Sequence, residues 1–198
     1  MVVKPRIYHQ TTLKQTMKKL LIAAFAIVAT AASTTAFAQT KMVGGAAMYP
    51  TKNIVENAVN SKDHTTLVAA VKAAGLVQTL ESAGPFTVFA PTNEAFDKLP
   101  KGTVETLVKP ENKATLTKIL TYHVVAGKIS AADLMEKIKM GKGKAELKTV
   151  EGGSLWAMMD GKKLYLVDEK GNKSWITIAD VNQSNGVIHV VNAVLMPK

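Results

Sequence analysis

The segment GPFTVFAPTNEAF, residues 84–96, is the most informative part of this sequence. It starts with an apolar run over residues 86–90 that suits one buried strand, and Pro91 closes the run. Thr92 follows, and a hydroxyl side chain directly before a helical stretch is typical of a helix N-cap. We therefore predict a strand that leads into a short helix. The side chains expected in the core of this strand are Phe86, Val88 and Phe89.

A second informative segment, NGVIHVVNAVLMP, covers residues 185–197. Its first two residues, Asn185 and Gly186, are typical of a tight turn that opens a strand. His189 lies between apolar residues on that strand, which favours a core or hydrogen-bonding role for its ring. A third segment, TYHVV, covers residues 121–125 and predicts the end of a helix followed by a short buried strand.

These three segments occur in the order and rough spacing of the fasciclin domain, and the chain closely resembles that family over about residues 53–197. The resemblance implies a β-wedge with helices packed around it and a role as an extracellular adhesion or matrix module. In some animal relatives the pair corresponding to Tyr122 and His123 is associated with adhesion, so both are candidate binding residues. The same pair equally suits a packed tyrosine and a histidine that satisfies buried backbone groups. Asn192 stands where the family often has an acidic residue, and there is no Arg-Gly-Asp sequence, so integrin-type adhesion is not implied.

The remaining pattern predicts one α+β domain of antiparallel or mixed strands, with helices mainly in the N-terminal half and hairpins in the C-terminal half. Apolar residues at helical spacing predict helices within residues 53–80, 103–107 and 111–122 and after Ser130. Strand-length runs separated by glycine-containing turns predict strands at residues 146–150, 154–159, 163–167, 175–179 and 187–191.

The N-terminus indicates export. Lys18 and Lys19 precede an apolar run that ends at Ala32, and residues 36–38 form an Ala-Phe-Ala cleavage signal. The run is shorter than the roughly 20 residues that a membrane span needs. We therefore expect a secreted or periplasmic protein, with either Met17 as its natural start or residues 1–16 as a long charged region of the signal. The expected parts are an N-terminal extension and signal peptide over 1–38 with cleavage after Ala38, a short linker over 39–52, and the fasciclin domain over 53–198.

Charge and composition narrow the possible partners. Five of the 25 basic residues lie before the predicted cleavage site, which leaves 20 lysines, no arginine and 15 acidic residues, a net charge of +5. Arginine is the usual reader of base edges, so nucleic acid is not an expected partner. The chain has no cysteine and therefore no disulfide. We expect a monomer without a transmembrane segment in the mature chain, which binds an extracellular or cell-envelope macromolecule.

The best candidate for a binding surface outside the core is a basic stretch over residues 137–144. Its lysines alternate with glycine and apolar residues, and they suit an anionic polysaccharide or a membrane surface. A solvated loop that serves solubility is the alternative. These lysines are Lys137, Lys139, Lys142 and Lys144. Three aromatic residues on neighbouring predicted strands suit either a sugar-stacking patch or packing across the strands, and they are Trp156, Tyr165 and Trp175.

No catalytic or metal-binding pattern is evident. The serines lack a Gly-x-Ser-x-Gly elbow, and the histidines share no metal-ligand spacing. We expect no enzyme activity, no cofactor and no metal, and a binding module for a cell-surface, matrix or biofilm component. One alternative is a periplasmic carrier or sensor of an apolar small ligand held between the helices and the wedge. Another is an unrecognised hydrolase.

Overall fold

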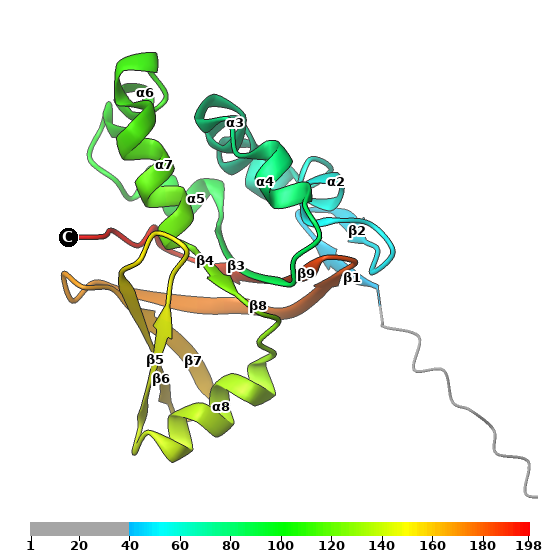
Figure 1. Cartoon of the computed structure of the whole chain (residues 1–198), viewed down its shortest axis with the longest axis vertical. Helices are drawn as coiled ribbons and strands as arrows, with labels where there is room; N and C mark the ends of the chain where they lie inside the picture. The colour runs from blue at the N-terminus through cyan, green and yellow to red at the C-terminus, as the bar shows by residue number, and fades with distance from the viewer. Residues whose placement is uncertain (1–39) are drawn as a thin grey trace, which may run out of the picture. The chain divides into compact units, whose positions relative to one another are not determined.

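A seven-stranded mixed sheet organises residues 40–198, the part of the chain that this computed structural model describes (Figure 1). From one edge to the other the strands are β4 (Val124–Ala126), β3 (Phe86–Pro91), β9 (Gly186–Val191), β8 (Lys173–Gln183), β7 (Lys163–Val167), β6 (Ser154–Asp160) and β5 (Lys144–Lys148). β3 and β9 run parallel, and all other neighbours run antiparallel. Val125 of β4 bridges Thr149, which follows β5, so the sheet is nearly closed. The predicted α+β class with mixed strands is confirmed.

Most helices precede the C-terminal hairpins, as the helical periodicity predicts. They are α2 (Ile54–Ala58), η1 (Lys62–His64), α3 (Thr65–Ala74), α4 (Val77–Glu81), α5 (Asn93–Asp97), α6 (Thr103–Leu107), η2 (Pro110–Asn112), α7 (Lys113–Tyr122) and α8 (Ala131–Met140). Thr92 caps α5, because its side chain accepts a hydrogen bond of 3.3 Å from the backbone N–H of Ala95. Ser130 and Asp133 form a capping box at α8. None of the helices in residues 40–198 combines the length and hydrophobicity that a membrane span requires.

The segment predicted as a linker contains a small hairpin, formed by β1 (Lys41–Val43) and β2 (Ala46–Met48). Two of its apolar side chains, Val43 and Met48, are buried in the same core as α2. The amide side chain of Asn57 fastens the hairpin to α2, because it binds both the backbone N–H and the carbonyl oxygen of Tyr49, at 3.0 and 2.8 Å. The predicted signal peptide and cleavage site lie outside the described residues, and the domain limits of 53–198 stay a prediction.

The two diagnostic segments of the sequence lie side by side as β3 and β9. The predicted Asn-Gly turn is displaced by one residue, because Gln183 pairs with Gly186 and the turn consists of Ser184 and Asn185. Gly186 is thus the first residue of β9. A Cβ atom there would collide with the carbonyl oxygen of Phe86, so the close approach of the two strands, rather than the turn, requires glycine.

Asn185 holds the helices to this turn through its side chain. Its amide nitrogen donates hydrogen bonds to the carbonyl oxygens of Leu80 and Ser82, at 2.7 and 3.0 Å. Its amide oxygen accepts the backbone N–H of Ile54 at 3.0 Å. One side chain therefore connects the start of α2 and the end of α4 to the strand pair at the centre of the sheet.

Two hydrophobic cores lie on either side of the central strands. The helix-side core packs α2 to α5 and α7 against β3 and β9, and the α8 core packs α8 against β5, β6 and β7. In Figure 1, α3, α4 and α7 lie above β8 and β9, whereas α8 lies below them. Because side chains alternate along a strand, β3 contributes Val88 and Ala90 to the helix-side core and Phe89 to the α8 core.

Candidate functional site

Tyr122, at the end of α7, is fully buried. Its hydroxyl group donates a hydrogen bond of 2.7 Å to the carbonyl oxygen of Ser154 and accepts one of 3.1 Å from the backbone N–H of Glu169. Burial raises the pKa of this phenol to about 12. Tyr122 therefore joins α7 to the strands of the α8 core and presents no surface to an external partner.

His123, the next residue, is buried and bound to the backbone through both ring nitrogens. Nδ1 donates a hydrogen bond of 2.9 Å to the carbonyl oxygen of Ile119, and Nε2 accepts one of 3.0 Å from the N–H of Leu195. Burial lowers the pKa of this ring to about 4, so it is neutral at pH 7. A binding surface made by Tyr122 and His123 is inconsistent with this burial, and the geometry favours the structural interpretation.

His189 is likewise buried among backbone partners. Its Nε2 donates a hydrogen bond of 2.9 Å to the carbonyl oxygen of Ile129, and Nδ1 accepts the N–H of Asp180 at 3.3 Å. The ring stacks on Phe89 with 5.7 Å between ring centroids. Asp180 lies within β8 at an irregular point of the ladder, and its carboxylate caps the start of α8 through the N–H of Ala131. The ring of His189 thus helps to join β8, β9 and the start of α8.

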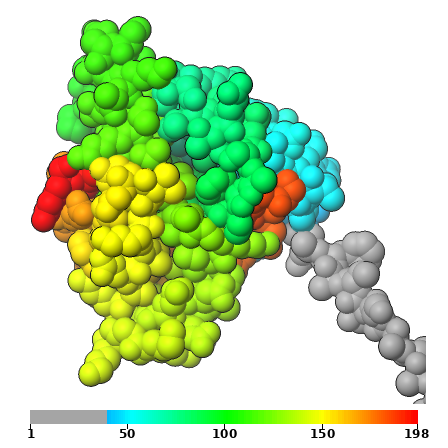
Figure 2. Space-filling model, viewed as in Figure 1, coloured from blue at the N-terminus to red at the C-terminus, as the bar shows by residue number. Residues whose placement is uncertain are grey.

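The four lysines of the basic stretch are exposed at the end of α8 and the start of β5. The turn between these elements projects from the lower end of the domain in Figure 2. Lys137 lies beside Asp133, and its charge helps to lower the pKa of that carboxyl group, after the larger effect of hydrogen bonds from Ser130. Lys144 instead covers an aromatic ring, with Nζ 4.5 Å from the centroid of Trp156. The four lysines therefore differ in their surroundings, because Lys137 has an acidic neighbour and Lys144 has an aromatic one.

The predicted aromatic residues share one face of the sheet with two lysines. Strand pairing places Tyr165 opposite Trp175, and their ring centroids are 4.8 Å apart. Lys173 lies over Tyr165, with Nζ 5.3 Å from the ring centroid. The set of Lys144, Lys173, Trp156, Tyr165 and Trp175 is called the lysine–aromatic face below. Sequence reasoning named the aromatic residues, but the positions of the lysines above them depend on strand register.

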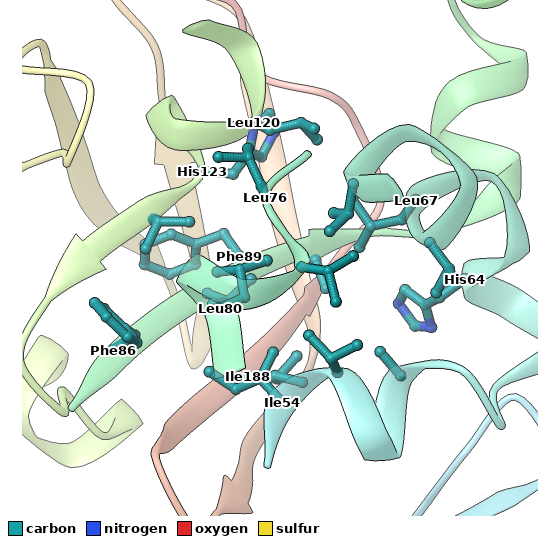
Figure 3. Close-up of a pocket in the computed structure, with 18 of the residues that line it drawn as sticks. Ile54, His64, Leu67, Leu76, Leu80, Phe86, Phe89, Leu120, His123 and Ile188 are labelled. Atoms are coloured by element: carbon teal, nitrogen blue, oxygen red, sulfur yellow. The ribbon is translucent and has the colours of Figure 1, made fainter. Parts of the chain in front are cut away.

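An apolar pocket lies in the helix-side core, between the helices and the sheet (Figure 3). Its volume, measured as the space open to the centre of a water molecule, is about 80 Å³. The walls come from α2, α3 and α4 on one side and from β3, β9 and the end of α7 on the other. Its exposed lining residues are Lys72, Thr79 and Val150, which mark where it reaches the surface. A carrier or sensor of an apolar small ligand, the alternative function considered from the sequence, would have a pocket at this place.

One polar side chain in the wall of the pocket has an unused hydrogen-bonding atom. His64 is 3 % exposed and lies at one side of the close-up in Figure 3. Nδ1 is 2.9 Å from the hydroxyl oxygen of Ser61, whereas Nε2 has no hydrogen-bond partner among the described residues. His64 is one of the histidines that share no metal-ligand spacing in the sequence, and no local pattern distinguishes it. Within residues 40–198, no group of three or more His, Cys, Asp or Glu residues is placed to hold a metal ion.

The comparisons with known proteins concern nearly the whole described part of the chain. Residues 62–197 match the family described as Fasciclin domain. The chain is 49% identical over 157 residues to Protein sll1483 of Synechocystis sp., which covers 79% of both chains. It is 37% identical over 145 residues to Immunogenic protein MPB70 of Mycobacterium bovis, which covers 71% of this chain and 66% of the relative.

More distant likenesses cover only part of the matching proteins. The chain is 31% identical over 135 residues to human periostin, which is 68% of this chain but 15% of periostin. A solved structure of a FAS1 domain pair from the insect cell adhesion molecule Fasciclin I matches with a TM-score of 0.66 at 17% identity. That match covers 73% of this chain and about half (51%) of the insect chain, and it bears on the fold alone.

Proposed function

Because this chain belongs to the fasciclin domain family, we propose that it is a secreted binding module that attaches to a cell-surface, matrix or biofilm component. The insect relative of the same fold is named as a cell adhesion molecule, which supports an adhesive role. The predicted signal peptide supports export. The partner that fits the surface best is an anionic polysaccharide.

The observation that carries this choice is the lysine–aromatic face. Lys144 and Lys173 each lie over an aromatic ring, and neither forms a salt bridge within the described residues. The nearby carboxylate of Glu146 is 3.9 Å from Nζ of Lys148 instead. Sugar rings present apolar faces that pack on aromatic rings, and their carboxylate or sulfate groups attract lysine. Lys139 and Lys142 extend the positive charge beyond the face.

Binding of the chain to alginate, an acidic polysaccharide, tests this proposal. The double substitution Lys144→Gln with Lys173→Gln should weaken binding by about tenfold, since exposed charge pairs contribute up to about 1 kcal/mol each. The affinity of the unchanged chain should fall as salt rises from 50 to 300 mM, because salt screens exposed charges. Neutral dextran should bind more weakly than alginate.

A matched control removes the same charge elsewhere. Lys101→Gln with Lys109→Gln changes two exposed lysines that flank α6, far along the chain from the lysine–aromatic face. This variant should bind alginate within about twofold of the unchanged chain. Equal losses in both variants would mean that net charge alone attracts the polysaccharide, and the proposed surface would then be wrong.

A second candidate function, binding of an apolar small ligand, is favoured by the pocket between the helices and the sheet. An apolar compound should then co-purify with the chain and be visible in a native mass spectrum. A spectrum that shows only the unliganded chain after gentle purification would count against this second function.

A further inference from the structure

The lysine–aromatic face lies on the solvent side of strands β5 to β8. Side chains alternate along these strands, so the residues between those of the face belong to the α8 core. Trp156 and Trp175 are partly exposed on the face, and they are the only tryptophans in the sequence. Lys144 and Lys173 are exposed. All four side chains are therefore accessible to a ligand in solution.

The face contains two groups, each of which combines a tryptophan with a lysine. The first group, called the β6 subsite below, is Trp156 with Lys144, whose Nζ is 4.5 Å from the ring centroid. The second group, called the β8 subsite, is Trp175 with Lys173. Both of its members contact the ring of Tyr165, at 4.8 Å between the ring centroids and at 5.3 Å from Nζ. Each subsite thus offers one aromatic surface and one positive charge.

The two subsites are too far apart for one sugar ring. Trp156 pairs with Val167 of β7, and Val167 pairs with Lys173 of β8, so these residues form one row across three strands. Trp175 lies two residues beyond Lys173 on β8. Two strand spacings and two residue steps place the Cα atoms of the tryptophans about 12 Å apart. A linear chain of sugars can contact both tryptophans, whereas a single sugar cannot.

Both lysines are available to a ligand. Glu146 shares the solvent side of β5 with Lys144, but its carboxylate accepts a hydrogen bond of 2.6 Å from the Ser154 hydroxyl and lies 3.9 Å from Nζ of Lys148. Neither Lys144 nor Lys173 forms a salt bridge in residues 40–198. Exposed contacts between an ammonium group and a ring are weak, so each ammonium group can leave its ring for the carboxylate of a ligand. The uncovered aromatic surface can then pack on the apolar face of a sugar.

We propose that the β6 and β8 subsites together bind one linear acidic oligosaccharide, with one charged sugar at each subsite. The inference rests on the proposed function and names the length and shape of its ligand. One exposed charge contributes little, so a single charged sugar should bind weakly at either subsite. A chain that occupies one subsite holds a further charged sugar near the other, which raises its effective concentration there. The ligand is therefore a chain with at least two charged sugars.

The two tryptophans allow each subsite to be observed separately. In the full chain, Trp156→Phe leaves Trp175 as the only source of tryptophan fluorescence, and Trp175→Phe leaves Trp156. Both variants are titrated with mannuronate, a single acidic sugar, and with oligomannuronates of increasing length, which are fragments of alginate. We expect both reporters to respond to a long oligomer at the same midpoint. Its affinity should exceed that of mannuronate by about a hundredfold or more.

The substitution Lys144→Gln tests whether one chain joins the two subsites. It changes the β6 subsite and is measured through Trp175 of the β8 subsite, in the Trp156→Phe variant. Affinity for a long oligomer should fall about threefold at this distant reporter, whereas the response to mannuronate should stay unchanged. The matched control is Lys148→Gln on the same strand, which should leave both titrations unchanged because Lys148 already lies beside Glu146.

The results separate this inference from the proposed function. A loss confined to the Trp156 reporter would mean two independent sites, and the inference would be wrong. Equal affinities for mannuronate and for long oligomers would also overturn it. So would a chain that binds alginate without a response of either tryptophan. If alginate does not bind at all, the proposed function itself fails.

Discussion

The α8 core and the helix-side core are built from the same kinds of residue, yet one is filled and the other is hollow. Leu134, Leu155 and Leu166 of the α8 core have no exposed surface at all. In the helix-side core, Leu67 and Leu80 retain 8 and 9 % exposure and line the apolar pocket. A hollow core forgoes contacts that would stabilise the fold. The comparison indicates that side chains pack tightly on one side of the sheet, whereas a cavity remains on the other side.

The largest effect should come from shortening one leucine in each core. Leu134→Ala should lower the free energy of unfolding by about 3–5 kcal/mol, because it opens a new cavity among tightly packed side chains. Leu67→Ala should cost only about 2 kcal/mol, because its side chain already borders empty space. Urea unfolding followed by circular dichroism measures both values.

These two substitutions form a matched pair. Each leucine lies on a ten-residue helix, α3 or α8, so the change in intrinsic helix propensity is the same. Equal losses of stability would mean that the helix-side core is packed as tightly as the α8 core, and the contrast would disappear.

Acid should destabilise the domain through His123, which borders the pocket and binds Leu195 of the α8 core. A proton on Nε2 would face the N–H of Leu195, so the folded pKa of about 4 lies below the roughly 6.5 of an unfolded histidine. The unfolded chain therefore binds more protons between these values. The stabilisation is complete above about pH 6.5 and is lost as the pH falls toward 4, by about 3 kcal/mol.

A variant separates His123 from the other titrating groups. His123→Gln retains a donor and an acceptor without titrating, so it should flatten the fall in stability between pH 6.5 and 4.5 while lowering stability at pH 7.5. Urea unfolding at a series of pH values provides the measurement. His64 and His189 also have lowered pKa values and should maintain part of the slope. A slope identical to that of the unchanged chain would show that His123 does not titrate on unfolding.

The smallest expected effect comes from adding one methylene group to a side chain in each core. Val191→Leu places a larger side chain at a fully buried position of the α8 core and should cost about 1–3 kcal/mol. Val71→Leu enlarges a residue that lines the pocket and should leave stability within about 1 kcal/mol, because the cavity accommodates the change. Thermal unfolding of both variants provides the measurement, and a large loss for Val71→Leu would contradict a hollow core.

Local patterns account for the features that the sequence predicted well. Apolar spacing and glycine turns identified the C-terminal hairpins, and the three fasciclin-like segments identified the fold. The parallel pairing of β3 with β9 joins residues 100 positions apart along the chain, and no local pattern reveals it. The turn at Asn185 was placed one residue too far along, because the glycine that suggests it serves a close strand approach instead.

The candidate sites also divide into features that follow from the local sequence and features that depend on contacts between distant residues. The exposed lysines followed from a charged stretch of sequence, whereas the burial of Tyr122 and His123 depends on β6 and on Leu195, which lie far along the chain. The pocket combines lining residues from Val43 to Ile188, so it exists only in the folded domain. The unpaired nitrogen of His64 is a property of that assembly and leaves no trace in the residues beside it.

The central position of β9 has a consequence for how the domain reaches its native state. β9 lies between β3 and β8 and is the last strand of the domain to leave the ribosome. Without β9, the strand pair β3–β4 and the meander β5–β8 meet only where Val125 of β4 bridges Thr149 after β5. We therefore expect the sheet to be completed only after residues 186–191 are made, because their pairing with β3 and β8 joins parts of the chain that are far apart in sequence.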